Sequence, residues 1–391
     1  MEIKNSLFDV AVLGGGPAGA ATSIHLRRLG RKVILFEGSS YNVPRIGETL
    51  APSIRPMLSE LVKWDSFLAT DPISSYGIKS AWGGNDLMST SFISSPFGSG
   101  WHIDRQIFDR MLCNFAAAEG VVVLYSSNVT DIVPKENVEE GWILKIRHSN
   151  NEKIKDKRKR VLSTEASFQA RSIINATGRS PVLIQKLRAK QIIYDSLVGL
   201  AARFQVIGEP VASFTLIEAT EDGWWYSAPL PHGGCIVVLM TDADIMARNH
   251  LNYSEVWMDY FNKTEHTKTR LFRCRLLEGL KIFSASSRRL TRHTYDYKWL
   301  AVGDAALAVD PLSANGIFFA LRSGRQGAHA IDHWLSGNPS DVLIYEQELD
   351  KERDQYLKNR YYYYELERRW PNAPFWQRRS APKSIGPEYQ D

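Results

Sequence analysis

The chain has 391 residues, of which 44% are hydrophobic, and a formal net charge of +5. This length and composition allow a large buried core in one or two domains, and they exclude a chain that is disordered throughout. The sequence has no apolar stretch near the roughly twenty residues of a membrane span and no signal-peptide-like segment before its first predicted strand, so we expect a cytoplasmic protein. Cys113, Cys235 and Cys274 are far apart, which predicts core thiols and neither a disulfide framework nor a metal site.

The first predicted elements form a strand, a glycine turn, a helix and a second strand, at residues 10–13, 14–19, 20–29 and 33–36. Gly14 permits the tight turn, Gly16 lets the backbone approach a pyrophosphate, and Gly19 lets the helix pack closely on the strand. Glu37 ends the second strand, where an acid accepts hydrogen bonds from the adenosine ribose. The pattern predicts nucleotide binding in preference to a purely structural turn.

Further nucleotide-domain elements are dispersed along the chain. We predict a helix over residues 101–119, a strand over 168–176 that leads into the turn at 177–179, and a strand over 299–302 that ends on Gly303 and Asp304. Residues 197–241 are rich in Val, Phe, Trp and Tyr and have turn signals at 221–223 and 232–234. This spacing predicts antiparallel strands that form a second sheet.

Much of the net positive charge lies in a basic cluster at residues 153–160. The flanking runs at 142–146 and 166–174 resemble strands, which favours a solvated hairpin tip over a nucleic-acid site. Binding of an acidic protein partner stays open as a second interpretation.

Four motifs are spaced along the chain: GGGPAG at 14–19, NATGRS at 175–180, VGDAA at 302–306 and DPLSANG at 310–316. In this set of motifs the chain resembles the FAD-dependent group A aromatic hydroxylases and the flavin-dependent halogenases of the same fold. The resemblance implies an α/β fold like that of p-hydroxybenzoate hydroxylase, in which an antiparallel-sheet substrate domain interrupts a Rossmann-like FAD-binding domain and a C-terminal helical region follows. We place the FAD-binding parts at residues 1–75, 101–190 (with the basic hairpin) and 286–340, the substrate-domain strands at 76–100 and 191–285, and the helical tail at 341–391.

The resemblance also implies a set of FAD-binding residues: Gly14, Gly16, Pro17, Ala18, Gly19, Glu37, Arg45, Gly47, Arg105, Gly178, Asp304, Pro311, Gly316 and Ile317. Asp304 would accept hydrogen bonds from the ribityl hydroxyls. The helix that begins near Gly316 would direct its free N–H groups at the flavin pyrimidine and stabilise negative charge on reduced flavin. A salt bridge with Asp109 is the alternative role for Arg105, and an ordinary exposed loop is the alternative for Arg45 and Gly47.

The reaction type is indicated by departures from the halogenases. Their W-x-W-x-I-P segment corresponds to WWYSAP at residues 224–229, and Ser313 and Ala314 stand where tryptophan halogenases have a glutamate and a serine. The lysine used in halogenation precedes a Gly-Ile pair by two residues, a position that Ser75 occupies here, and Lys79 is out of register. These departures favour hydroxylation over halogenation.

Hydroxylation by this family implies that reduced FAD reacts with O2 to give a C4a-hydroperoxide, which transfers a hydroxyl group to an electron-rich ring. NAD(P)H or a separate flavin reductase would supply the electrons. The protein must exclude water and hold the ring. We predict an aromatic pocket wall of Trp82, Trp101, Trp224, Trp225 and Tyr226, and proton-handling or orienting roles for Glu48, Lys79 and His102. Ordinary core packing is the alternative for each aromatic residue, and a structural role is the alternative for each polar one.

Four further segments carry a narrower resemblance: GETLAPS at 47–53, SAWG at 80–83, GWHIDR at 100–105 and GWWYSAPLP at 223–231. They are similar to segments of the flavoproteins that accompany amine or amino-acid oxidases carrying cysteine tryptophylquinone. This resemblance implies a tryptophan side chain in a partner protein, the precursor of a quinone-dependent oxidase, as the substrate. The alternatives are hydroxylation or halogenation of a small indole, pyrrole or phenol, flavin-dependent reduction of a carbon–carbon double bond, and a non-catalytic flavoprotein chaperone.

The region from Tyr345 onward contains aromatic residues among many charges, at 361–364, 370, 375 and 376. We predict an amphipathic helix whose aromatic face closes over the flavin domain and which Pro371 and Pro374 end. A partner-binding surface is the alternative.

Overall fold

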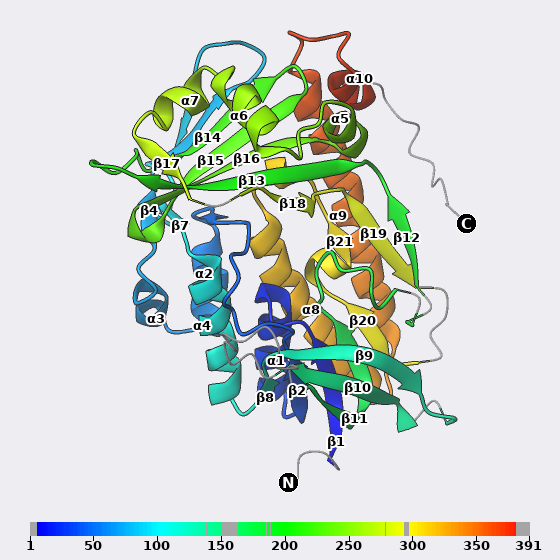
Figure 1. The fold of residues 1–391 in the computed structure, drawn as a ribbon. Helices are drawn as coiled ribbons and strands as arrows, with labels where there is room; N and C mark the ends of the chain where they lie inside the picture. Colours follow the sequence, from blue (N-terminus) through cyan, green and yellow to red (C-terminus); the bar gives the residue numbers. More distant parts are fainter. Residues whose placement is uncertain are drawn as a thin grey trace.

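The computed structural model describes residues 6–137, 140–149, 163–184, 186–187, 189–277, 279–292 and 297–380. A mainly parallel sheet lies at one end of the molecule and a mainly antiparallel sheet at the other (Figure 1). The long helices α8 (Gly316–Leu335) and α9 (Ser340–Glu365) extend along the direction that leads from one sheet to the other. The family fold expected from the sequence is thus present.

The parallel sheet is built around the first strand of the chain. Its order is β8 (Val122–Leu124), β2 (Val33–Phe36), β1 (Leu7–Leu13), β11 (Ser163–Asn175), β10 (Trp142–Ser149) and β9 (Ser127–Pro134), with β20 (Trp299–Ala301) beside β11. Strand β1 pairs in parallel with β2 and β11, and helix α1 (Pro17–Arg28) follows it directly. The predicted strand, turn, helix and strand are confirmed.

The second sheet confirms the antiparallel strands predicted for residues 197–241. Its order is β17 (Cys274–Leu276), β13 (Leu197–Val206), β16 (Gly234–Asp242), β15 (Gly223–Leu230), β14 (Thr215–Thr220), β5 (Gly77–Ala81) and β6 (Met88–Ser91), with β18 (Lys281–Ser284) beside β13. One face of this sheet packs on the helices α5 (Ala243–Arg248), α6 (Ser254–Asn262) and α7 (His266–Arg270).

Shorter elements join the two sheets. Two small sheets have the orders β12 (Ala189–Ile193), β19 (Arg288–Arg292), β21 (Leu307–Ala308) and β3 (Thr49–Leu50), β7 (Gly100–His102), β4 (Ile73–Ser75). The remaining helices are α2 (Ile54–Leu61), α3 (Trp64–Leu68), α4 (Arg105–Ala118), α10 (Pro374–Ser380) and the 3-10 turns η3 (Pro231–Gly233), η4 (Gly303–Ala305) and η5 (Pro311–Ser313).

The helix predicted over residues 101–119 begins later than expected, at Arg105. Residues 100–102 form strand β7, and Asp104 caps the helix because its side chain accepts hydrogen bonds from the backbone N–H groups of Gln106 and Ile107. The capping acid therefore marks the true helix start.

The C-terminal region also differs from the prediction. Helix α9 ends at Glu365, before Pro371, and Pro374 begins α10 in the first helical turn, where proline is tolerated. Tyr345 packs in the core of the parallel-sheet domain, but Tyr364, Phe375 and Trp376 pack against the antiparallel sheet. The aromatic residues of the tail are therefore buried mainly against the antiparallel sheet, and not over the parallel-sheet domain as predicted.

Within the described residues, no helix is both long and apolar enough to cross a membrane. Strands β10 and β11 pair antiparallel from Trp142 and Ala170 to Ser149 and Ser163, so they flank the basic cluster as expected. The cluster itself, residues 153–160, lies outside the described residues.

Candidate active site

A cavity of about 690 Å³ reaches from the carboxyl ends of the parallel strands to the inner face of the antiparallel sheet. Leu13, Ala176 and Val302, at or just beyond the ends of β1, β11 and β20, line one end, and Tyr226 and Val238 line the other. Ligands of open α/β sheets bind at this edge of the strands. The cavity therefore joins the predicted nucleotide site to the predicted substrate side.

The glycine turn after β1 has the geometry that its sequence predicts. Gly14 has a φ of +109°, and a Cβ there would lie 2.3 Å from the carbonyl oxygen of Ala176. A Cβ on Gly19 would lie 1.9 Å from the carbonyl oxygen of Gly14. Both positions therefore require glycine. Gly16 precedes α1, whose first turn carries no acidic residue and whose N-cap makes no side-chain hydrogen bond, so the helix N-terminus is suited to an anion.

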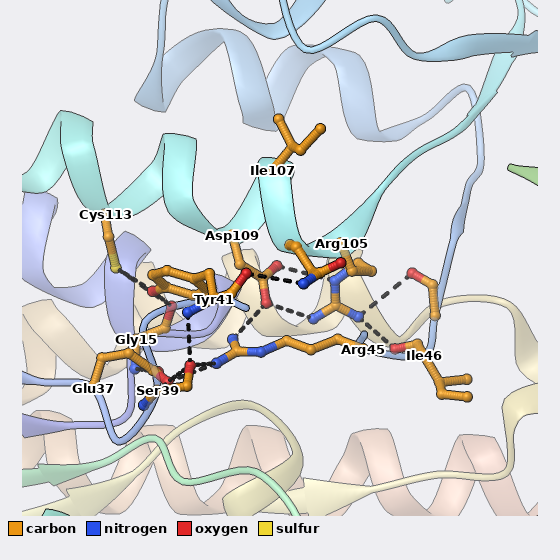
Figure 2. Close-up of polar contacts among 12 residues, drawn as sticks. Gly15, Glu37, Ser39, Tyr41, Arg45, Ile46, Arg105, Ile107, Asp109 and Cys113 are labelled. Atoms are coloured by element: carbon orange, nitrogen blue, oxygen red, sulfur yellow. Dashed lines mark hydrogen bonds and ion pairs between the residues drawn. The ribbon is translucent and has the colours of Figure 1, made fainter. Parts of the chain in front are cut away.

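Two arginines and two acids form an ion network along the cavity wall (Figure 2). Arg45 donates to Glu37 at 2.6 Å and to Asp109 at 2.8 Å, and Arg105 donates to Asp109 at 3.0 Å and to the carbonyl oxygen of Ile46 at 2.8 Å. Glu37 also accepts a hydrogen bond from the Gly15 N–H at 2.9 Å. The salt bridge that was the alternative role for Arg105 is therefore present, and the same arginine also lines the cavity.

Asp109 is expected to be the stabilising centre of this network, because its side chain is fully buried between the two arginines. Asp109→Asn should lower the free energy of unfolding by about 2 kcal/mol, since it leaves partly buried charge without its partner. Glu60→Gln removes an exposed partner of Arg325 and should cost less than about 0.5 kcal/mol. Urea unfolding of both variants tests this; equal losses would show that the Asp109 network adds no more than a surface pair.

Asp304 and Arg179 lie on another part of the cavity wall. The guanidinium Nε of Arg179 donates to Asp304 at 3.0 Å, and its other nitrogens donate to the carbonyl oxygens of Ser286 and Val309. Helix α8 begins at Gly316 without a side-chain cap or an acid in its first turn. The Asp304 carboxylate and this helix N-terminus thus both line the cavity.

The register of the antiparallel sheet defines the other wall. Residues paired across strands share a face, and the pairs Ile78 with Thr215, Ile217 with Tyr226, and Trp224 with Met240 all line the cavity. The first and third positions of the WWYSAP segment therefore face the cavity, as Trp224 and Tyr226.

Trp225, Trp82 and Trp101 lie in packing clusters instead. Trp225 is on the other face of the sheet, with ring centroids 5.1 Å from Trp257 and 6.1 Å from Phe261. Trp82 packs on Trp376 at 5.4 Å and donates to the Tyr363 carbonyl. Trp101 packs on Phe67 at 5.5 Å. For these three residues the structure supports the core-packing alternative.

Of the predicted proton-handling residues, Glu48 lines the cavity and Lys79 does not. Glu48 lines the cavity and is fully buried; its Oε2 accepts from the Gly47 N–H, and its Oε1 has no hydrogen-bond partner among the described residues. Lys79 alternates with Ile78 and so faces away from the cavity, where its ammonium group lies 4.4 Å from the centroid of Phe214. Only Glu48 of these two is placed to meet a ligand.

His102 lies behind the cavity wall and reaches it through a threonine. Its Nδ1 is 3.3 Å from the Thr49 hydroxyl, which is 2.8 Å from the Tyr226 hydroxyl, and both Thr49 and Tyr226 line the cavity. Burial lowers the pKa of His102 to about 3, so the imidazole is neutral at physiological pH. A role for His102 was predicted from the sequence. None was predicted for Thr49, which connects it to the cavity and lies within the GETLAPS segment at 47–53.

Burial raises the pKa of Glu48 above its ordinary value of 4.5. At pH values between the ordinary pKa of 4.5 and the raised pKa of the folded state, the folded state binds more protons than the unfolded state. The stability of the wild-type protein therefore falls as pH rises through this range. Glu48→Gln removes the titration. We expect the melting temperature of the variant, measured relative to wild type, to rise as pH increases from 4.5. A difference that stays constant with pH would contradict the burial effect.

Comparison with known proteins decides the family. The sequence profile of the tryptophan halogenases matches residues 85–391. The chain belongs to the tryptophan halogenase family. LodB of Marinomonas mediterranea, named as an FAD-dependent oxidoreductase, is 30% identical over 386 residues, which cover 96% of this chain and 97% of LodB.

Solved structures of the tryptophan halogenase fold are similar over most of the chain. The myxobacterial chondrochloren halogenase CndH, an FAD-dependent halogenase, has a TM-score of 0.83 at 22% identity and covers 97% of this chain and 87% of its own. The peptidyl tryptophan dihydroxylase QhpG has a TM-score of 0.68 at 23% identity and covers 97% of this chain and 80% of its own. This protein is therefore an FAD-dependent enzyme of the tryptophan halogenase family.

The cavity has room for FAD beside the glycines that are predicted to bind it. Gly16, Gly178 and Gly316 line the cavity, and a Cβ added to any of them would meet open space. All the predicted FAD-binding residues line this cavity except Gly19, which packs against the turn: Gly14, Gly16, Pro17, Ala18, Glu37, Arg45, Gly47, Arg105, Gly178, Asp304, Pro311, Gly316 and Ile317. The residues present thus fit FAD. Their individual roles stay predictions.

Proposed function

We propose that this protein is an FAD-dependent monooxygenase that hydroxylates a tryptophan side chain of a partner protein. The observation that carries the proposal is that a carboxyl group, and not a lysine, lines the cavity. Lys79 faces away from the cavity and Ser75 occupies the lysine position of the halogenases, whereas the buried carboxyl of Glu48 lines the cavity. This arrangement favours oxygen transfer over halogenation.

FAD would lie along the glycine and arginine wall. The N-terminus of α1 would receive the pyrophosphate, Glu37 the ribose, and Asp304 the ribityl chain, while α8 would direct its N–H groups at the flavin ring. When bound and reduced, FAD supplies the activation of O2; NAD(P)H or a separate reductase would provide its electrons.

The protein's own residues would bind the indole and exclude water. Trp224, Tyr226 and Met240 form an apolar wall on the sheet, with Phe283 beside them. Aromatic side chains of this kind pack well against an indole ring. The Tyr226 hydroxyl lies 2.8 Å from the Thr49 hydroxyl, and this hydrogen bond fixes the orientation of the Tyr226 ring in the wall.

Glu48 would handle the proton. Its raised pKa keeps the carboxyl protonated over part of the pH range in which other glutamates are charged, and its Oε1 lacks a partner in the described part of the chain. A protonated carboxyl can act as a general acid: Oε1 can give its proton to the oxygen atom of O2 that the ring does not receive, and the resulting carboxylate can take up the proton that the ring loses. His102 is assigned an orienting role through Thr49.

The class of substrate is supported by one protein of the same fold. QhpG is described as a peptidyl tryptophan dihydroxylase essential for tryptophylquinone cofactor biogenesis. Together with the motifs shared with flavoproteins of quinone-dependent oxidases, this favours an indole on a polypeptide.

Halogenation of an aromatic ring is the second candidate, because the family profile and CndH belong to halogenases. Co-expression of this protein with the precursor of a tryptophylquinone oxidase, in medium containing chloride and bromide, separates the candidates. The intact mass of the precursor should gain oxygen at a tryptophan. A mass gain of halogen would favour the second candidate, and an unchanged mass with confirmed co-folding would contradict a protein substrate.

A further inference from the structure

Three side chains of helix α9 point to one buried residue, Asp310. Tyr356, Arg360 and Tyr364 are spaced by four residues and therefore share one helix face, which we call the inner stripe of α9. The Tyr356 hydroxyl accepts from the Asp310 N–H at 3.0 Å, the Arg360 Nε lies 3.9 Å from the Asp310 carboxylate, and the Tyr364 hydroxyl donates to it at 2.7 Å. The tail thus holds one residue from three sides.

Asp310 begins a segment that lines the flavin side of the cavity. Its side chain accepts from the Leu312 N–H at 2.9 Å and so caps the 3-10 turn of residues 311–313, and Ala314 follows with a φ of +49°. Residues 311–314 all line the cavity. A non-glycine residue in the left-handed region persists only where its surroundings fix it, so this loop depends on the anchoring of Asp310.

Tyr364 also reaches the opposite wall. Its hydroxyl accepts a hydrogen bond from the indole Nε1 of Trp224 at 3.0 Å, and Trp224 is a cavity residue of the antiparallel sheet. Burial and the nearby Asp310 carboxylate raise the pKa of Tyr364, which keeps the hydroxyl protonated as a donor. One hydroxyl therefore connects the sheet wall, the C-terminal helix and the flavin-side loop.

Tyr364 differs in this from its neighbours. It is the fourth of consecutive tyrosines at residues 361–364 and is fully buried, whereas Tyr362 is 58% exposed and Tyr363 is 52% exposed. The neighbours therefore provide controls of the same residue type on the same helix.

We propose that the inner stripe of α9, with Tyr364 at its end, is a positioning element of the FAD site: it fixes the loop at residues 311–314 through Asp310 and the sheet wall through Trp224. Tyr364 is a positioning residue and not a catalytic one, because it acts through these two neighbours. The proposal rests on the FAD site of the proposed function.

FAD titration of the purified apoprotein, followed by quenching of flavin fluorescence, tests it. Tyr364→Phe keeps the ring and removes both hydrogen bonds, so the dissociation constant for FAD should rise about 10-fold and the visible spectrum of bound flavin should shift. Tyr362→Phe changes a side chain outside the inner stripe. It should keep the dissociation constant within about 2-fold of wild type and leave the flavin spectrum unchanged.

Urea unfolding of each apoprotein distinguishes positioning from simple packing. A Tyr364→Phe variant that loses stability but keeps the wild-type dissociation constant and flavin spectrum would overturn the proposal. If that variant does not fold, Tyr356→Phe, which removes the hydrogen bond to the Asp310 N–H, should weaken FAD binding in the same direction, and unchanged binding there would equally overturn it. Wild-type protein that binds no FAD would instead refute the proposed function.

Discussion

Gly16→Leu is expected to abolish FAD binding while the protein still folds. Gly16 has an extended ψ with a φ of −76°, which leucine adopts without strain, and a Cβ there meets open space at a residue that lines the cavity. The leucine side chain would occupy the room of the pyrophosphate. We expect the affinity for FAD to fall by ~100-fold or more, equivalent to ~3 kcal/mol, in a fluorescence titration.

Gly279→Leu is the matched control, because Gly279 also meets open space but is exposed and outside the cavity lining. It should bind FAD as wild type does. Gly14→Leu should behave differently from both, since its φ of +109° and the contact with Ala176 strain any side chain and destabilise the fold. Full FAD occupancy in Gly16→Leu would refute the location of the cofactor.

Glu48→Gln is expected to lower the rate of substrate oxygenation by about 100-fold without loss of FAD, the size of effect typical of a removed general acid. Glutamine has the same shape and can donate a hydrogen bond from the buried position, but it cannot transfer a proton. The measurement that reports this loss is the amount of oxygenated product, and of hydrogen peroxide, formed from O2 per reduced flavin oxidised.

Glu60→Gln makes the same substitution at an exposed ion pair and should leave both amounts unchanged. A Glu48→Gln variant that oxygenates its substrate at the wild-type rate would assign Glu48 a structural role, which was the alternative from the outset.

The sequence was most informative where backbone geometry restricts residue choice. Gly14 and Gly19 are positions where any Cβ would collide with main-chain atoms, so the glycine spacing predicted the turn and its neighbours correctly. The antiparallel strands were also predictable, because alternating β-branched and aromatic residues between turns have few other interpretations.

Long-range placement was less predictable. The sequence alone does not distinguish the tryptophans at 82, 224 and 225. Only the strand register places Trp224 in the cavity and Trp225 on the other face of the sheet. Helix α9 pairs a buried Tyr364 with exposed Tyr362 and Tyr363, and the tyrosine run alone does not say which of them faces inward. The spacing of Tyr356, Arg360 and Tyr364 was a signal that could have indicated the inner stripe.

The most direct test of the account is a reaction of purified components: this protein with chemically reduced FAD, isotopically labelled dioxygen and the precursor polypeptide of a tryptophylquinone oxidase. Peptide mapping by mass spectrometry should find the labelled oxygen on a tryptophan of the precursor, and the Gly16→Leu variant should give none. An unlabelled precursor, with all of the reduced flavin reoxidised and the O2 that it consumes recovered as hydrogen peroxide, would contradict the hydroxylation of a protein tryptophan if it is found under conditions where the two proteins bind each other.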